Sequence, residues 1–122
     1  MPRKILIVED ETSILIPLRF LMEQNGFTVM AAESGEEAIA VLPSFRPDLV
    51  LLDIMLPRMD GFEVCQHIRQ NTELRHVKII MLSAKGGDID VTKGLAVGAD
   101  DYIPKPFSNK EVVRRIRDML LS

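Results

Sequence analysis

Residues 49–53 read LVLLD, four apolar residues that end on a carboxylate. Residues 5–8 (ILIV) and 79–82 (IIML) are equally apolar, and polar residues follow each of them as well. Strands that are buried on both faces of a parallel sheet have continuous apolar runs of this kind, whereas half-exposed strands alternate. The three runs therefore predict the interior of a parallel sheet.

Working outward, two further strands are predicted at residues 28–32 and 101–103, and segments with helical spacing of apolar residues alternate with the strands. These predicted helices cover residues 12–24, 35–43, 61–70, 88–97 and 109–121. Strands that alternate with helices form parallel sheets with right-handed crossovers. The sequence thus predicts an α/β fold, a doubly wound five-stranded parallel sheet with five helices on both faces.

Composition and length limit the classes of protein. The chain has 122 residues and a net charge of −3, which predicts one domain over residues 1–122 and argues against binding nucleic acid or membrane by net charge. A single cysteine, Cys65, excludes an internal disulfide framework and a cysteine-based zinc site. The first apolar run stops at Glu9, short of the ~7–15 apolar residues in a signal peptide core, and no run approaches the ~20 of a membrane span. We expect a cytoplasmic protein.

Polar residues gather where the predicted strands end. Glu9 and Asp10 follow the first strand, Asp53 the third and Ser83 the fourth, and Lys105 comes soon after the fifth. Ligands of doubly wound sheets bind beyond the carboxyl ends of the strands, so these side chains should share one edge. Any one of them alone is more often a turn or capping residue. Five at one edge predict a functional site.

The residue types restrict the chemistry of this site. Two carboxylates ~4 Å apart repel by roughly 4 kcal/mol at an effective dielectric of 20, so three need a proton or a cation. Oxygen ligands favour a hard ion, Mg²⁺ with Mn²⁺ as the alternative, over zinc. Such an ion and Lys105 could neutralise a phosphoryl group, and the Ser83 hydroxyl could donate to it. A carboxylate can itself be the nucleophile and become an aspartyl phosphate.

Several motifs in the same order resemble the receiver domain of two-component response regulators. They are IVED (7–10), LLDIMLP (51–57), MDG (59–61), LSAK (82–85), GADDY (98–102) and KPF (105–107). The resemblance runs from residue 3 to about residue 121 and implies the flavodoxin-like strand order 2-1-3-4-5. It also implies a phosphorylation-dependent signalling switch in a two-component phosphorelay.

The resemblance assigns Asp53 as the phosphoacceptor. It assigns Asp10 as a direct metal ligand, Glu9 as its acidic neighbour, and the backbone carbonyl of Met55 as a further ligand beside Asp53. The implied cofactor is Mg²⁺, or Mn²⁺ in its place. Glu9 is longer than the aspartate that often occupies this position in the family, which affects the geometry expected around the ion.

Three more residues receive roles from the resemblance. Ser83 matches the hydroxyl residue that bonds a phosphoryl oxygen, Lys105 the lysine that pairs with the phosphoryl group, and Tyr102 the aromatic switch that turns inward when Ser83 moves. The Lys105–Pro106 peptide bond is expected to be cis. The implied output surface is formed by the fourth helix, the fifth strand and the fifth helix, and it carries Lys93, Asp100, Asp101, Arg115 and Arg117.

The implied partner is a histidine kinase or a phosphotransfer protein, and phosphorylation is expected to promote a weak homodimer through the output surface. The chain would assist its own phosphorylation and dephosphorylation at Asp53 without being an enzyme in the usual sense. The alternative is an aspartyl-phosphate phosphohydrolase, but such enzymes commonly carry a second aspartate where this chain has Met55. A receiver that works without phosphorylation and a flavin carrier are weaker alternatives, because the acidic site is intact and Glu9 and Asp10 would repel an anion.

Overall fold

The computed structural model describes residues 2–83 and 88–121. Its strands are β1 (Lys4–Val8), β2 (Thr28–Ala32), β3 (Leu49–Asp53), β4 (Lys78–Ser83) and β5 (Asp101–Pro104). All neighbouring strands are parallel, and they lie in the order β2-β1-β3-β4-β5. The predicted fold class and strand order are confirmed.

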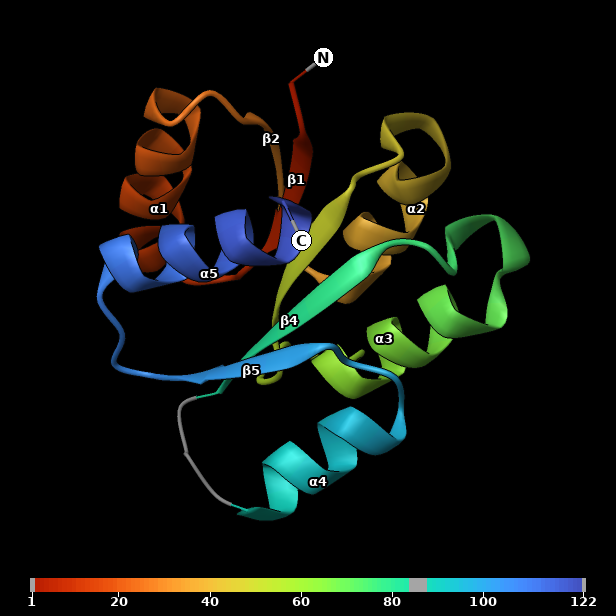
Figure 1. Ribbon diagram of the computed structural model, residues 1–122. Coiled ribbons are helices and arrows are strands. Elements are labelled where there is room, and N and C mark those ends of the chain that lie inside the picture. The colour runs from red at the N-terminus through yellow and green to blue at the C-terminus, as the bar shows by residue number, and fades with distance from the viewer. Residues whose placement is uncertain (1, 84–87, 122) are drawn as a thin grey trace.

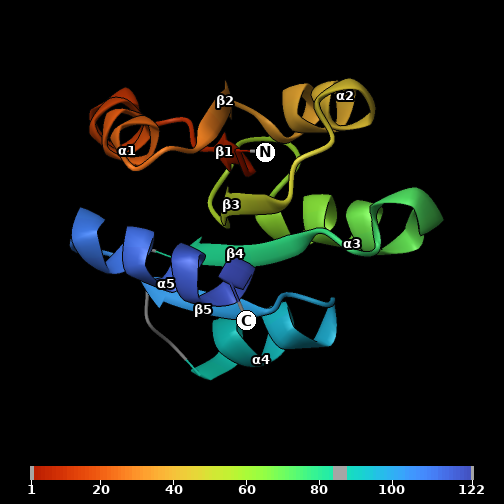
Figure 2. The same ribbon diagram turned by 45° about the horizontal axis from the view of Figure 1, so that its top comes forward.

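The helices are α1 (Thr12–Gln24), α2 (Gly35–Phe45), α3 (Gly61–Gln70), α4 (Asp88–Ala96) and α5 (Asn109–Leu121), with a short 3₁₀ turn η1 (Thr72–Leu74). Figures 1 and 2 show α1 and α5 on one face of the sheet and α2, α3 and α4 on the other. Helix α2 runs two residues past its predicted end, because Pro43 does not stop it and the chain leaves the helix only at Arg46, in a left-handed conformation (φ 51°). Helix α4 ends one residue before its predicted end.

Alternate residues of the central strands supply two separate cores. Leu6 and Val8 face the layer of α2 and α3, where they join Leu42 and Ile68 in one buried cluster. Ile5 and Ile7 face α1 and α5 and belong to a second cluster. Every residue of β3 is buried, as its apolar run predicts. The sheet is therefore covered on both sides, and its free surfaces are the two ends of the strands.

Strand register brings the predicted site residues to one of these ends. Asp53 is paired with Leu82, and Ser83 with Pro104, so the last residues of β3, β4 and β5 lie side by side. The loop after β3 turns sharply into α3 at Gly61, where an added Cβ would lie 2.5 Å from the Asp53 carbonyl oxygen. Within residues 2–83 and 88–121, none of the helices has the length and apolar content needed to cross a membrane.

Candidate functional site

Two carboxylates and one ammonium meet below the surface at the carboxyl edge of the sheet. Glu9 and Asp53 are 0% and 1% exposed, although both carry ionisable groups. The Nζ of Lys105 lies 2.9 Å from Glu9 Oε1 and 3.3 Å from Asp53 Oδ2. One lysine thus neutralises parts of two buried carboxylates at once.

Backbone hydrogen bonds hold each of these side chains in place. Glu9 extends the pairing of β1, because its N–H donates to the Ala32 carbonyl at 3.0 Å. The Met55 N–H donates to Asp53 Oδ1 at 3.1 Å. The Lys105 N–H donates to the Ser83 carbonyl at 2.6 Å, which anchors the start of the loop after β5 to the end of β4. The site is built on strand ends and their first loop residues, which are rigid supports.

Asp10 completes an acidic cluster that could hold a cation. It is exposed, and one carboxylate oxygen from each of Glu9, Asp10 and Asp53 lies within 4.8 Å of the others. Among the residues that the structure describes, Lys105 pairs with Glu9 and Asp53, and Asp10 adds a third carboxylate beside them. A cluster of oxygen donors that is short of positive charge fits a hard divalent ion.

Burial and the contacts within the cluster shift the pKa values of Glu9 and Lys105. Burial raises the pKa of the Glu9 carboxyl from 4.5 to about 7; the hydrogen bond from Lys105 opposes the rise and Asp53 adds to it. Burial also acts to lower the pKa of Lys105, but its hydrogen bonds and charge interactions with Glu9 and Asp53 outweigh this and the net shift is upward. Lys105 therefore stays an ammonium, while Glu9 holds a proton readily near neutral pH.

The other predicted residues lie around this centre. Ser83 ends β4 and is 1% exposed, at the same edge as Asp53. Met55 turns its side chain outward, where it is 65% exposed, so only its backbone faces the site. Tyr102 lies further along the sheet; it is paired with Met81, two residues before Ser83, and packs partly buried against the core on the α2–α3 face. The Lys105–Pro106 peptide bond is cis, as predicted.

A second, partly exposed ion pair was not predicted from the sequence. The guanidinium of Arg69, on the last turn of α3, donates to Asp100 Oδ2 and the Gly98 carbonyl, both at 2.8 Å, and to the Val77 carbonyl at 2.7 Å. Asp100 Oδ2 also accepts from the Ile79 N–H at 2.8 Å. We call Arg69, Asp100 and these partners the Arg69 cluster; it joins α3, the start of β4 and the turn before β5.

The predicted output surface carries its own ion pairs. Arg115 lies 3.4 Å from Asp101 Oδ2 and 3.2 Å from Glu111 Oε1, and it donates to the Tyr102 carbonyl at 2.8 Å. Lys93 differs from the prediction, because its Nζ lies over the ring of Phe62 on α3, 4.6 Å from the centroid. A cation attracted to an aromatic face turns away from the surface that it was expected to supply.

Comparison with known proteins gives a consistent result. Residues 5–117 match the family described as the response regulator receiver domain. The chain is 45% identical over 120 residues to the alkaline phosphatase synthesis transcriptional regulatory protein PhoP of Bacillus subtilis (strain 168); this covers 98% of the chain but 49% of PhoP, so the chain spans about half the length of that relative.

Solved structures show the same fold. A crystal structure of a protein assigned as a response regulator of Chloroflexus aurantiacus J-10-fl is 34% identical, with a TM-score of 0.94 and full coverage of both chains. The chemotaxis protein CheY4 of Vibrio cholerae is 28% identical, with a TM-score of 0.92 over 97% of this chain and 98% of its own.

Proposed function

The chain belongs to the family of response regulator receiver domains, and from this premise we propose that residues 1–122 form one receiver domain that is phosphorylated on Asp53. As a receiver domain, it is a signalling switch of a two-component system. The observation that carries the proposal is the position of Asp53, a carboxylate that is 1% exposed and lies 3.3 Å from the Lys105 ammonium. Burying such a charge is costly unless it is paired, and buried ionisable groups of this kind are concentrated at functional sites.

The phosphoryl transfer that we propose is a displacement at phosphorus. A carboxylate oxygen of Asp53 attacks the phosphoryl group of a phosphohistidine, a P–O bond forms, the P–N bond breaks, and the donor's imidazole leaves with the electron pair. Lys105, already beside Asp53, neutralises a phosphoryl oxygen, and the Ser83 hydroxyl donates to another. The Met55 N–H keeps Asp53 oriented during the attack.

The acidic cluster fits a divalent ion. We propose that Glu9, Asp10, Asp53 and the Met55 carbonyl hold Mg²⁺, or Mn²⁺ in its place. The cluster of oxygen donors supports this assignment. The pKa of Glu9, which burial raises and Asp53 raises further, agrees with it. When bound, the ion supplies positive charge next to the phosphoryl oxygens. Glu9 contributes by releasing its proton to become a charged partner.

The proposed donor is a histidine kinase or a phosphotransfer protein in the cytoplasm. Helix α1 exposes Ile16 (64%) and Phe20 (61%), one turn apart. Beside α1, a hollow of about 410 Å³ is lined by residues that include Pro17, Lys105 and Phe107. Apolar side chains next to a cleft that reaches the reactive site favour a docked protein partner over a small diffusing substrate. With a net charge of −3, we do not propose that the domain itself binds nucleic acid.

The test is phosphorylation by a small phosphodonor with Mg²⁺, followed by intact mass. The wild-type protein is expected to gain one alkali-labile phosphoryl group, and Asp53→Asn to gain none. Asp118→Asn, which changes an exposed carboxylate on α5 (71% exposed side chain), is the matched control and should label fully. Label on Asp53→Asn would overturn the assignment. Sustained turnover of phosphate esters would favour a phosphohydrolase instead.

A further inference from the structure

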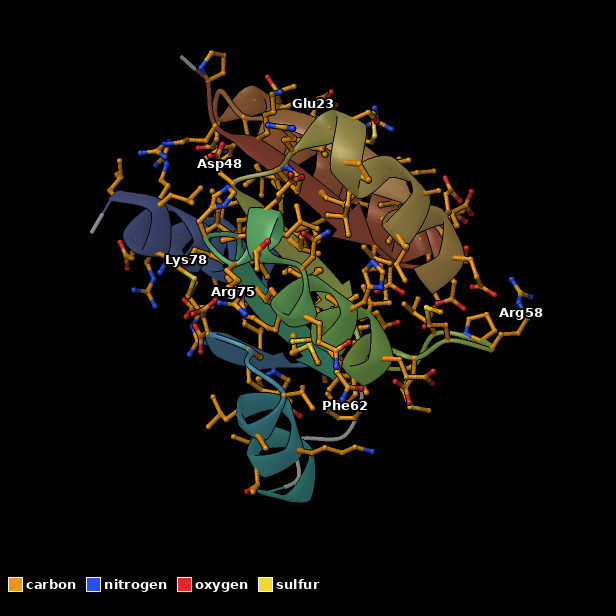
Figure 3. The ribbon with its side chains drawn as sticks, turned by 90° about the vertical axis from the view of Figure 1, so that its right-hand side faces the viewer. Glu23, Asp48, Arg58, Phe62, Arg75 and Lys78 are labelled. Carbon is orange, nitrogen blue, oxygen red and sulfur yellow. The ribbon has the colours of Figure 1, made fainter. Side chains whose placement is uncertain are left out.

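One face of α3 holds α4. Phe62, Cys65 and Arg69 are spaced three and four residues apart, so they lie along one side of the helix. The Phe62 ring lies under Lys93 Nζ (4.6 Å), Cys65 Sγ lies 3.5 Å from the Val97 carbonyl oxygen, and Arg69 Nε donates to the Gly98 carbonyl (2.8 Å). Figures 1 and 2 show α3 and α4 as neighbours on one face of the sheet, and Figure 3 shows Phe62 where α3 approaches α4.

The carboxyl end of α4 is firmly attached. Arg69 is bonded to the Asp100 carboxylate and to three carbonyl oxygens, and its side chain is only 21% exposed. Gly98 has φ +106°, and a Cβ there would lie 2.7 Å from Arg69 Cγ, so the arginine packs directly on the turn. Hydrogen bonds to charged groups are stronger than those between neutral groups. This end of α4 is therefore an anchor.

Residues 91–96 of α4 are held less tightly than this end. Among residues 91–96, Gly94 is the one buried residue, and Leu95 is 55% exposed. Gly94 makes ordinary contacts, with the position of its Cβ 3.9 Å from the Phe62 ring and 3.8 Å from Met81. The cation–π contact of Lys93 is at an exposed site, where such contacts are weak. Elements that bury little apolar surface open locally at small cost.

Phe62 also connects this contact to the phosphorylation site. It follows Gly61, whose N–H donates to the Ile54 carbonyl at 3.0 Å and whose backbone packs against the Asp53 carbonyl. A change of backbone position at Asp53 would therefore move the first turn of α3 and the ring that Lys93 contacts. The contact between Lys93 and Phe62 thus lies one residue from Gly61, whose backbone touches the proposed phosphoacceptor.

We propose that α4 pivots about its Arg69 anchor and that Lys93, stacked on Phe62, latches α4 in the resting position of the switch. The inference rests on the proposed function, since it describes how phosphorylation of Asp53 would release α4. A contact present only in the resting state opposes activation. By reciprocity, removing that contact strengthens binding of any ligand that favours the active state.

The first experiment measures the affinity for beryllofluoride with Mg²⁺, a mimic of the phosphoryl group. Loss of the latch in Lys93→Gln should tighten binding about two- to fivefold, the equivalent of an exposed cation–π contact. Lys93→Arg keeps the cation and should match the wild type, as should the control Lys110→Gln on α5. Phe62→Leu should tighten binding similarly, and the double variant should add nothing further, since both changes remove one contact.

The second experiment is hydrogen exchange without beryllofluoride. Amides of residues 91–96 should exchange faster in Lys93→Gln than in Lys110→Gln, whereas the Asp100 amide, bonded to the Ile79 carbonyl at 2.8 Å, should stay protected. Unchanged or weaker beryllofluoride binding by Lys93→Gln would overturn the latch. Equal acceleration of exchange at Asp100 would overturn the pivot. A wild-type protein that binds no beryllofluoride would overturn the proposed function instead, and exchange would still decide whether Lys93 holds α4.

Discussion

The acidic site, formed by Glu9, Asp10, Asp53 and Lys105, and the Arg69 cluster lie at opposite ends of the sheet. The first gathers where the strands end; the second gathers where β4 and β5 begin. Both place ionised side chains in or near the protein interior. Figure 3 shows the two ends of the molecule, with Asp48, Arg75 and Lys78 near one and Arg58 near the other.

The two clusters differ in charge balance. In the Arg69 cluster one guanidinium meets one carboxylate, and carbonyl oxygens accept its remaining hydrogens. In the acidic site Lys105 faces more carboxylate than it can neutralise, and the pKa of Glu9 is raised to about 7. A balanced cluster is complete without a ligand, and it stabilises the fold. An unbalanced cluster is completed only by a further cation or a proton, which is the physical mark of a binding site.

Removal of divalent cations is the change expected to have the largest effect, and it should act on the acidic site alone. Excess chelator should reduce phosphorylation of Asp53 to background, because the carboxylates would repel an incoming phosphoryl group. Added Mg²⁺ or Mn²⁺ should restore labelling, and intact mass measures both. Asp10→Asn should weaken ion binding, measured by calorimetry. Undiminished labelling in chelator would show that Lys105 alone balances the site, and the comparison would fail.

Breaking the Arg69 cluster should affect stability and leave the chemistry intact. Arg69→Met would remove the ion pair with Asp100 and the hydrogen bonds to three carbonyl oxygens, which should lower the free energy of unfolding by about 2–3 kcal/mol. Arg114→Met, which removes ion pairs of an arginine whose side chain is 61% exposed, should cost under about 1 kcal/mol. Urea denaturation measures both variants. Under conditions in which it is folded, Arg69→Met should be phosphorylated on Asp53 as fully as the wild type. That result would show that the Arg69 cluster stabilises the fold and takes no part in the chemistry.

The sequence predicts these two regions unequally, for physical reasons. Apolar runs reveal buried strands, and parallel strands bring their last residues to one edge, so Glu9, Asp53 and Lys105 could be assembled from local patterns. The bonds of Arg69 depend on how the last turn of α3 approaches a turn 31 residues away, which no spacing encodes. The direction of Lys93 has the same origin, because it is set by the tertiary position of Phe62.

The pH dependence of stability should also distinguish the two regions. A carboxyl with a higher pKa in the folded state binds its proton more tightly there, so stability falls as pH rises from the unfolded value to the folded one. With chelator present, Glu9 should reduce the free energy of unfolding by an amount on the order of 2 kcal/mol between pH 4.5 and about 7. Glu9→Gln should remove this part of the slope, measured by urea denaturation across that range. If the free energy of unfolding of Glu9→Gln keeps the same dependence on pH, the group with the raised pKa is not Glu9.

The ion pairs of Arg115 are a third case, and the effect expected from them is the smallest. Arg115 and its partners Asp101 and Glu111 are each about one-third exposed, and the charges are already paired within one chain. Exposed pairs are worth about 0.2–1 kcal/mol, so exchanging them for pairs with a second copy should give only weak association.

We therefore predict that beryllofluoride promotes a weak dimer through the face of α4, β5 and α5, detectable by sedimentation at low salt, where charge pairs are least screened. Arg115→Glu should abolish it, because the new carboxylate would face Asp101 and Glu111 in both copies, whereas Arg19→Glu, on α1 outside this face, should leave it intact. Within one chain, the charge of Arg115 is already neutralised by Asp101 and Glu111, as the charge of Arg69 is by Asp100. Charge balance by itself would therefore give Arg115 a purely structural role. The arginines themselves differ: the Arg69 side chain is 21% exposed and donates to three carbonyl oxygens, whereas that of Arg115 is 35% exposed and donates to the Tyr102 carbonyl. The ion pairs of Arg115 should therefore exchange partners at lower cost than those of Arg69. A beryllofluoride-induced dimer that survives Arg115→Glu would show that these pairs, too, serve only the fold.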